Sequence, residues 1–242
     1  MEVPVKVEAT GHCDAVSECD IRAGENCSIP VSVAKNFELS VRITPVTSVS
    51  AFYLFSKRMF DVFFSFIGII ICFIPMLLVA ASIVIESKGG AIFKQERLGL
   101  NGVPFTMYKF RSMRIDAEAN GPQWAADNDP RCTKVGRFIR LVRLDELPQL
   151  FNILKGDMSF VGPRPERKCF YEEFEKTIPG FSDRLAVKPG LTGLAQIEGG
   201  YLLSPSEKIV YDRKYIRTRS MKIDISCMLK TIRIVITHEG AR

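Results

Sequence analysis

The longest apolar run in the chain lies between residues 62 and 85. From Val62 to Ile85 there is no charged side chain. At about 1.5 Å per residue, a continuous helix over this run is about 36 Å long, enough to cross a bilayer core of about 30 Å. A buried core helix is the alternative, but soluble helices of this length carry a polar face and this run has none. The pattern therefore predicts a membrane helix within residues 52–86.

Pro75 lies just past the middle of the run and removes a helical hydrogen bond, so we expect a kink or break there. Basic residues flank the run on both sides: Lys57 and Arg58 before it, and Lys88, Lys94 and Arg97 after it. Positive charge favours the cytoplasmic side of a membrane. A re-entrant helix, broken at Pro75 and leaving through the face it entered, keeps both clusters inside. An ordinary kinked span stays open as the alternative.

After residue 86 the pattern changes to that of a mixed α/β, mostly helical domain. Residues 91–95 and 105–110 predict two short strands joined by a turn at 100–102. Helices are expected at 135–143, 145–155 and 166–176, the second starting near Asp145 because Pro148 fits only in a first turn. Ser204 and Glu207 have the spacing of a capping box and predict a helix that runs to about residue 217.

A last helix carries Ile225, Leu229, Ile232 and Ile236 on one side, together with basic residues. This pattern suits an interfacial helix on anionic lipid, and equally an amphipathic helix packed on the domain. The predicted organisation is an extension of ill-defined structure (1–51), a membrane helix (52–86) and a compact catalytic domain (87–242).

The composition favours some kinds of ligand and partner and disfavours others. The net charge of +6 fits an anionic partner such as lipid, nucleotide or phosphate. Seven cysteines without a C-x-x-C pair, and only two histidines, make a zinc site improbable. Basic residues alternate with acidic ones and no aromatic stacking platform is evident, so we expect no nucleic-acid partner.

The densest polar cluster runs from residue 137 to 167. Asp145 and Glu146 are adjacent carboxylates, which can bind Mg²⁺, and arginines such as Arg140 can bind phosphate oxygens. Each element alone has an ordinary explanation: carboxylates at a helix start offset its dipole, and arginines are often solvated. Arg164 is less ordinary, because prolines on both sides hold it in a stiff, extended loop.

Longer motifs support a specific assignment. The segments are KRMFD (57–61), the apolar run with its proline, FKQERLGLNGVPFTMYKFRSM (93–113), DPRCTKVGRFIR (129–140), LDELPQLFNILKGDMSFVGPRPE (144–166), KPGLTGLAQI (188–197), YDRKYI (211–216) and IDI (223–225). In these segments, over about residues 52–240, the chain resembles the bacterial sugar transferase family. These monotopic polyprenyl-phosphate phosphoglycosyl transferases, or undecaprenyl-phosphate sugar phosphotransferases, initiate exopolysaccharide and related glycan synthesis.

The resemblance implies a mechanism and a location. Asp145 matches the family's nucleophile, which attacks the β-phosphate of a UDP-sugar, releases UMP and holds a phosphosugar that polyprenyl phosphate then removes. Glu146 completes the dyad, Mg²⁺ bridges dyad and diphosphate, and Lys109, Arg111, Arg140 and Arg164 fall in segments that contact anions. The family implies a bacterial inner membrane location with the catalytic domain on the cytoplasmic face. The oligomeric state, including a homo-oligomer, and the sugar stay open.

There are departures from the family pattern. Arg143 stands where a small polar residue is frequent, and Glu198-Gly199-Gly200 replaces a turn that usually carries an arginine. The four additional spans of the larger members are absent, which predicts the small form. Two other functions stay open: a membrane phosphohydrolase that uses the same site with water, and a non-catalytic anionic-lipid binder.

Overall fold

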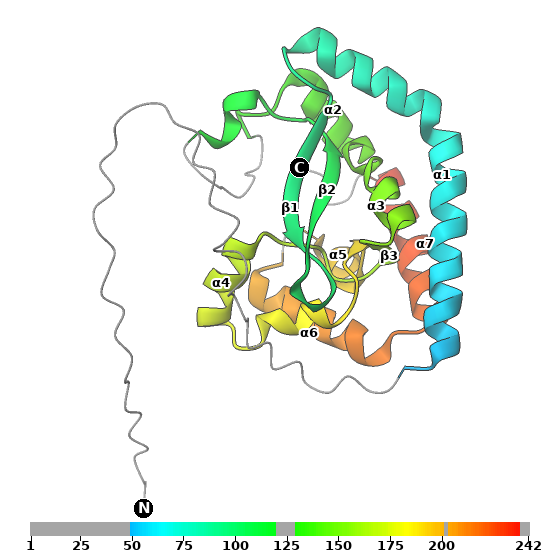
Figure 1. Cartoon of the computed structure of the whole chain (residues 1–242). Coiled ribbons are helices and arrows are strands. Elements are labelled where there is room, and N and C mark those ends of the chain that lie inside the picture. The colour runs from blue at the N-terminus through cyan, green and yellow to red at the C-terminus, as the bar shows by residue number, and fades with distance from the viewer. Residues whose placement is uncertain (1–48, 120–128, 201–202, 238–242) are drawn as a thin grey trace, which may run out of the picture. The chain divides into compact units, whose positions relative to one another are not determined.

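The computed structural model describes residues 49–119, 129–200 and 203–237 (Figure 1). The chain divides into two units, Met1–Glu38 and Leu39–Arg242, and all the described residues lie in the second. Nearly all of the predicted extension 1–51 therefore lies outside the described residues. The described residues of this unit are mostly helical, as the sequence predicts, and they form two small two-stranded sheets, of which the sequence predicts one.

Helix α1 (Ala51–Glu86) contains the whole predicted apolar run. It is helical on both sides of Pro75, and Figure 1 shows its ribbon bending along its length. Of the kink or break expected at Pro75, the break is wrong, because α1 continues through the proline. One lost hydrogen bond bends a helix whose neighbouring bonds persist. Only 17% of its most apolar stretch is buried, which excludes a core helix. Val62 is half-buried, whereas Ile85 is exposed on the outward apolar face.

Both ends of α1 are hydrogen-bonded to the rest of this unit. Near its start, Arg58 donates to the carbonyls of Ile153 and Leu154, both at 2.8 Å. At its end, a Glu86 carboxylate oxygen accepts from the Lys134 N–H at 2.7 Å. The basic flank near the start of α1, at residues 57–58, and the end of the helix, at Glu86, are therefore both bonded to the same domain.

Strands β1 (Ile92–Leu98) and β2 (Pro104–Phe110) form an antiparallel hairpin in which Ile92 pairs with Phe110. The predicted hairpin is confirmed, although β1 extends three residues beyond the expected end. The short helix η2 (Leu100–Gly102) makes the turn, where Asn101 adopts φ 56°. The hairpin brings Lys109 and Arg111 to the end of β2, ahead of the short helix η3 (Ile115–Glu118).

The two predicted helices around the acidic pair have different bounds. Helix α2 (Lys134–Leu141) ends before Arg143, which has φ 60°. A separate 3₁₀ turn, η4 (Leu144–Glu146), follows, and α3 (Gln149–Lys155) begins only after Pro148. A helix start at Asp145 is therefore wrong. The left-handed residue and the proline separate the acidic pair from both helices.

The remaining elements surround a second, parallel strand pair, β3 (Ser159–Val161) and β4 (Gly190–Thr192), which the sequence reasoning missed. Helices α4 (Lys168–Thr177), η5 (Phe181–Ala186) and α5 (Leu194–Glu198) connect to it. Helix α6 (Pro205–Thr218) has the predicted capping box between Ser204 and Glu207, which is confirmed. In α7 (Met221–Thr237) the predicted apolar residues Ile225, Leu229, Ile232 and Ile236 are exposed, so this face does not pack on the described domain.

Candidate active site

The acidic dyad, Asp145 and Glu146, lies in the η4 turn between α2 and α3. Leu144 and Leu147, on either side of it, pack against the apolar cluster around Phe110 and Ile139. The two carboxylates are thereby fixed on a short, rigid turn. A 3₁₀ turn places consecutive side chains about 120° apart, so the two members of the dyad face different surroundings.

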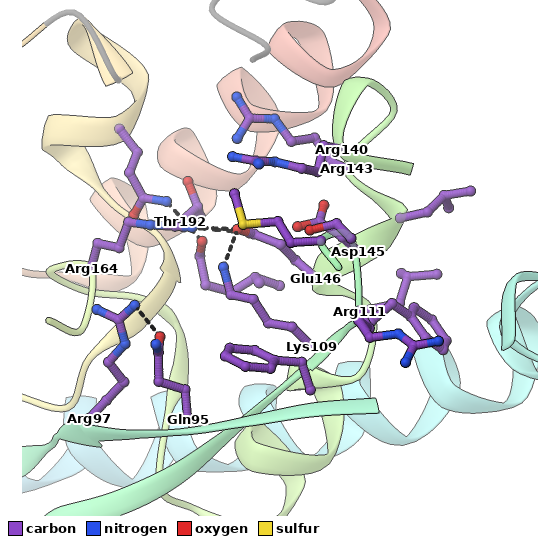
Figure 2. A pocket seen from close by; sticks show the side chains of 18 of the residues that line it. Gln95, Arg97, Lys109, Arg111, Arg140, Arg143, Asp145, Glu146, Arg164 and Thr192 are labelled. Atoms are coloured by element: carbon purple, nitrogen blue, oxygen red, sulfur yellow. Dashed lines mark hydrogen bonds and ion pairs between the residues drawn. The ribbon is translucent and has the colours of Figure 1, made fainter. Parts of the chain in front are cut away.

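Glu146 is the paired member of the dyad. Its Oε1 lies 3.2 Å from Lys109 Nζ on β2 and 2.5 Å from Arg164 Nη2 in the loop after β3. Figure 2 shows both cations converging on this carboxylate. Burial alone would raise the pKa of Glu146, but Arg164 and then Lys109 outweigh it and hold the pKa well below its ordinary value. Glu146 is therefore ionised.

Asp145 is the unpaired member. It is buried, and within residues 49–119, 129–200 and 203–237 no hydrogen bond or ion pair reaches its carboxylate. Burial, and then the negative charge of Glu146, raise the pKa of Asp145 above its ordinary value. A buried carboxylate without a partner is costly for stability, which is typical of functional sites. It is also free to bond to a phosphorus atom or a cation.

Arg140 and Arg143 add positive charge beside the dyad. Figure 2 shows their side chains close together on the same side of Asp145. Arg140 donates to Cys132 Sγ at 3.0 Å and lowers the pKa of Asp145 by its charge, while Arg143 does the same for Glu146. From the sequence, Arg143 belongs to the dense polar cluster and departs from the family pattern, but it was not among the predicted site residues; its left-handed backbone brings it to the site.

Arg111 does not join these residues. Its guanidinium donates to the carbonyls of Ser87 at 2.9 Å and Lys88 at 2.6 Å, just after the end of α1. In Figure 2 it is turned away from the dyad. Arg111 also lines the cavity beside the dyad, and a contact between Arg111 and phosphate stays a prediction. Side chains two residues apart on a strand point to the same face, so an extension of β2 would place Arg111 beside Lys109. The carbonyls at the end of α1, which have no partner within the helix, bind Arg111 instead.

The Pro-Arg-Pro loop, residues 163–165, has almost every backbone carbonyl bonded. Pro163 accepts from the Gly190 N–H at 2.9 Å, and Glu166, just beyond the loop, from the Leu98 N–H at 3.1 Å. Side-chain cations bind the other two carbonyls: Arg184 donates to Arg164 at 2.9 Å and Arg97 to Pro165 at 3.2 Å. The predicted stiffness of the loop thus comes from its partners as well as its prolines.

Close backbone contact between β3 and β4 requires glycine at three positions: 162, 190 and 193. A Cβ on Gly190 would lie 2.1 Å from the Gly162 nitrogen, and one on Gly193 would lie 2.2 Å from the Gly162 oxygen. No side chain fits in this space. The glycines of the KPGLTG segment therefore set the position of the Pro-Arg-Pro loop and, through it, of Arg164.

A cavity of about 1050 Å³ opens beside the dyad. Four predicted site residues besides the dyad line it: Lys109, Arg111, Arg140 and Arg164. Arg97, Arg143, Arg167, Arg184 and Lys208 add further cations. Ile197, Ile234 and Val235, from α5 and α7, give it an apolar wall. The cavity can hold a ligand with a strongly anionic part and an apolar part.

Arg97 was noted from the sequence only as part of the basic flank of the apolar run, and Arg184 was not singled out. Arg184 is fully buried and forms a 2.7 Å ion pair with Asp212, also buried. Arg97 pairs with Glu166 at 2.9 Å. Nothing in their local sequence distinguishes them from solvated arginines, since both pairs join residues far apart in the chain.

Comparison with known proteins identifies the family. The family model for bacterial sugar transferases matches residues 52–238, and the chain belongs to this family. A UDP-N-acetylgalactosamine-undecaprenyl-phosphate N-acetylgalactosaminephosphotransferase from Aeromonas hydrophila is 43% identical over 197 residues, which cover 80% of this chain and 46% of that protein. A putative undecaprenyl-phosphate N-acetylgalactosaminyl 1-phosphate transferase from Bacillus subtilis is 48% identical over 157 residues, 64% of this chain and 87% of that protein.

A third relative, the galactosyl transferase CpsE of Streptococcus agalactiae, is 38% identical over 252 residues. This match covers 99% of this chain, so it extends into the first 51 residues, which the sequence reasoning could not place. The chain spans about half the length of the Aeromonas and Streptococcus relatives, 46% and 52%.

Proposed function

We propose that this chain transfers a sugar 1-phosphate from a UDP-sugar to undecaprenyl phosphate, and so initiates exopolysaccharide or related glycan synthesis. The observation that carries the proposal is that the two carboxylates of the dyad have different surroundings. Asp145 is buried, unpaired and open to a cationic cavity, while Glu146 is held by Lys109 and Arg164. An unpaired carboxylate among cations suits covalent attack on an anionic phosphate.

In the first step Asp145 attacks the β-phosphorus of the UDP-sugar. A bond forms between the carboxylate oxygen and phosphorus, and the bond from phosphorus to the bridging oxygen breaks, so UMP leaves with that oxygen. Arg140, Arg143 and Arg164 lie where they can offset the negative charge of the diphosphate. The raised pKa of Asp145 means that nearby positive charge is needed to keep it ionised for attack.

In the second step a phosphate oxygen of the lipid attacks the phosphosugar on Asp145. The new phosphorus–oxygen bond forms as the aspartyl–phosphorus bond breaks, which restores the carboxylate. Asp145 is the nucleophile of the first step and the leaving group of the second, and both steps use one cationic cavity, so donor nucleotide and acceptor lipid occupy the site in turn. The apolar wall from α5 and α7 suits the hydrocarbon part of the acceptor.

The dyad also suits Mg²⁺. In the part of the chain that the structure describes, no third His, Cys, Asp or Glu joins Asp145 and Glu146 as a metal ligand. Mg²⁺ is commonly held by one or two carboxylates, with substrate phosphates and water completing its octahedron. The unpaired Asp145 has ligand oxygens available, and Glu146 can share Oε2, which Arg164 Nη1 reaches only at 3.5 Å. Bound there, Mg²⁺ would neutralise part of the diphosphate charge.

The attachment of α1 supports a monotopic, re-entrant arrangement on the bacterial inner membrane. A straight span would separate its ends by the bilayer core of about 30 Å and leave them on opposite sides. Instead, Arg58 near one end and Glu86 at the other both bind the catalytic domain. The apolar face of α1 points outward, as lipid contact requires, and the exposed apolar residues of α7 suit the interface of the cytoplasmic leaflet.

The acceptor and donor classes come from the relatives. The names of the Aeromonas and Bacillus proteins include undecaprenyl phosphate, and the first also names its UDP-sugar. A glucose-1-phosphate transferase from Klebsiella pneumoniae has the same acceptor in its name. We therefore assign undecaprenyl phosphate as acceptor and a UDP-sugar as donor, and we leave the sugar to experiment.

The test is UMP release by the purified protein in detergent, with UDP-N-acetylgalactosamine, UDP-galactose and UDP-glucose in parallel. Multiple turnovers should require both undecaprenyl phosphate and Mg²⁺, with one sugar preferred. Without lipid, at most one equivalent of UMP per protein should appear, together with a protein mass increased by one phosphosugar. Continuous UMP release without lipid would instead show a phosphohydrolase. The absence of UMP with every sugar would contradict the proposal.

A further inference from the structure

Lys57, on the first third of α1, is turned inward. Its Nζ donates to Asp224 Oδ2 at 2.8 Å, to the Val161 carbonyl at 3.1 Å and to Tyr215 Oη at 3.3 Å. These three contacts use the full donor capacity of an ammonium group. A lysine that only contacted lipid headgroups, or only set the orientation of α1 in the membrane, would keep its charged group in water. Lys57 instead keeps only 16% of its side chain exposed.

The acceptor of this ion pair is more deeply buried than Lys57. Asp224 on α7 keeps 4% of its side chain exposed and also accepts from the hydroxyls of Tyr53 at 2.9 Å and Tyr215 at 2.8 Å. Burying two charges is costly unless their remaining hydrogen-bonding groups are satisfied, as they are here. A network of this kind fixes geometry more than it adds stability.

The Val161 carbonyl connects this network to the candidate active site. It accepts from Lys57, and the Tyr215 hydroxyl lies 3.0 Å away, its single hydrogen shared between Val161 and Asp224 Oδ1 at 2.8 Å. Val161 comes three residues before Arg164. Between them, Gly162 is packed against the β4 backbone and Pro163 is fixed in φ. Because these two residues cannot adjust, a displacement of Val161 also displaces Arg164.

We propose that Lys57 and Tyr215 are positioning residues: by holding the Val161 carbonyl they fix the Pro-Arg-Pro loop, so that the contact of Arg164 with Glu146 depends on the packing of α1 against the domain. The inference rests on the transferase function proposed above. By this inference the position of the membrane helix affects catalysis, because Arg164 contacts Glu146 in the correct geometry only when α1 is packed against the domain.

Two variants separate this role from simple folding. Lys57→Met alone would leave the Asp224 carboxylate buried without its cation, so the paired variant Lys57→Met with Asp224→Asn removes both charges together. Tyr215→Phe keeps the ring and removes the hydroxyl, and with it the contacts to Val161, Asp224 and Lys57, while both charges of the ion pair stay in place. The matched control is Lys88→Met, which removes an exposed lysine just beyond the other end of α1. Thermal unfolding and membrane-fraction yield confirm that each protein is folded and inserted.

The first readout is hydrogen–deuterium exchange of the peptide over residues 158–167, which does not depend on turnover. We expect faster exchange in the paired variant and in Tyr215→Phe, and no change in Lys88→Met. Unchanged exchange in a folded Tyr215→Phe protein would overturn the proposal. If the UDP-sugar panel gave no turnover in the wild type, the proposed function would fail while this measurement still tested the contact.

The second readout is kcat. We expect it to fall roughly tenfold or more in the paired variant, since a misplacement of about 1 Å can cost about a hundredfold, and to stay at the wild-type value in Lys88→Met. In an Arg164→Lys background the paired variant should lower kcat by a much smaller factor, because it acts through Arg164. An equal factor in both backgrounds would show that Lys57 acts elsewhere and would overturn the proposal.

Discussion

Arg164 contacts Glu146 at 2.5 Å and leaves Asp145, the neighbouring carboxylate, without an ion pair in the described part of the chain. Two adjacent acids of similar intrinsic pKa thus have opposite environments. Glu146 is stabilised as an anion by Arg164 and Lys109, whereas burial and Glu146 itself disfavour the charge on Asp145. Pairs of acids whose pKa values are pushed apart commonly have different chemical roles.

Replacing Asp145 by asparagine should abolish UMP release and leave the protein folded and in the membrane fraction. The side chain makes no hydrogen bond that the fold depends on, and its removal takes away a buried charge, so we expect the free energy of unfolding to change by less than about 1 kcal/mol. Activity assays and thermal unfolding of the same preparation measure both effects. Turnover retained by Asp145→Asn would refute the nucleophile assignment.

Lys109→Gln should move the acidic limb of the pH–rate profile to higher pH. Lys109 lowers the pKa of Asp145 by its charge, so its loss raises that pKa further. The nucleophile must be ionised, and a higher pKa means that it becomes protonated, and activity falls, at a higher pH than in the wild type. The measurement is kcat against pH for both proteins at saturating Mg²⁺. A limb that stays in place or moves to lower pH would contradict this coupling.

Arg111→Met should lower stability and leave substrate affinity unchanged. The guanidinium binds the carbonyls of Ser87 and Lys88 at the end of α1, and each charged hydrogen bond of this kind contributes about 1.5–3 kcal/mol. We therefore expect a lower Tm with an unchanged KM for the UDP-sugar. If the Tm were preserved and KM rose, the phosphate contact that the family resemblance predicts would be supported instead.

Gly190→Ala should prevent correct packing of the Pro-Arg-Pro loop. The new Cβ would lie 2.1 Å from the Gly162 nitrogen, backbone that cannot move aside, so we expect a loss of about 3 kcal/mol or more in stability and little activity. Gly90→Ala is the matched control, because no atom lies within 4 Å of its Cβ position. Equal Tm values for the two variants would contradict the close β3–β4 contact.

Both ends of α1 should lie on the cytoplasmic side. Single cysteines placed at Ser50 and Gly90 in a cysteine-free protein should both escape an impermeant maleimide added to intact spheroplasts. Both should react in inverted membrane vesicles. The physical reason is that both ends of α1 are bonded to the same domain, at Arg58 and at Glu86. Labelling of either position from outside would show an ordinary span.

Much of the local structure could be predicted from the sequence. The apolar run from Val62 to Ile85, the hairpin around Asn101 and the capping box at Ser204 depend on neighbouring residues only, and each is confirmed. The candidate site residues Asp145, Glu146 and Arg164 came from adjacent charges, flanking prolines and family motifs, and the structure brings them together beside Lys109. Their catalytic roles stay predictions.

The long-range pairing of charged side chains at and around the site was decided only by the tertiary structure. Lys57 and Asp224 are 167 residues apart, and Arg111 reaches back 23 residues to the Lys88 carbonyl. The sequence identifies these residues as charged and places them at the ends of elements. Because these contacts form only between groups that the fold brings within about 4 Å, local sequence alone could not assign Arg111 to the end of α1, Lys57 to Asp224 and Val161, or an unpaired carboxylate to Asp145.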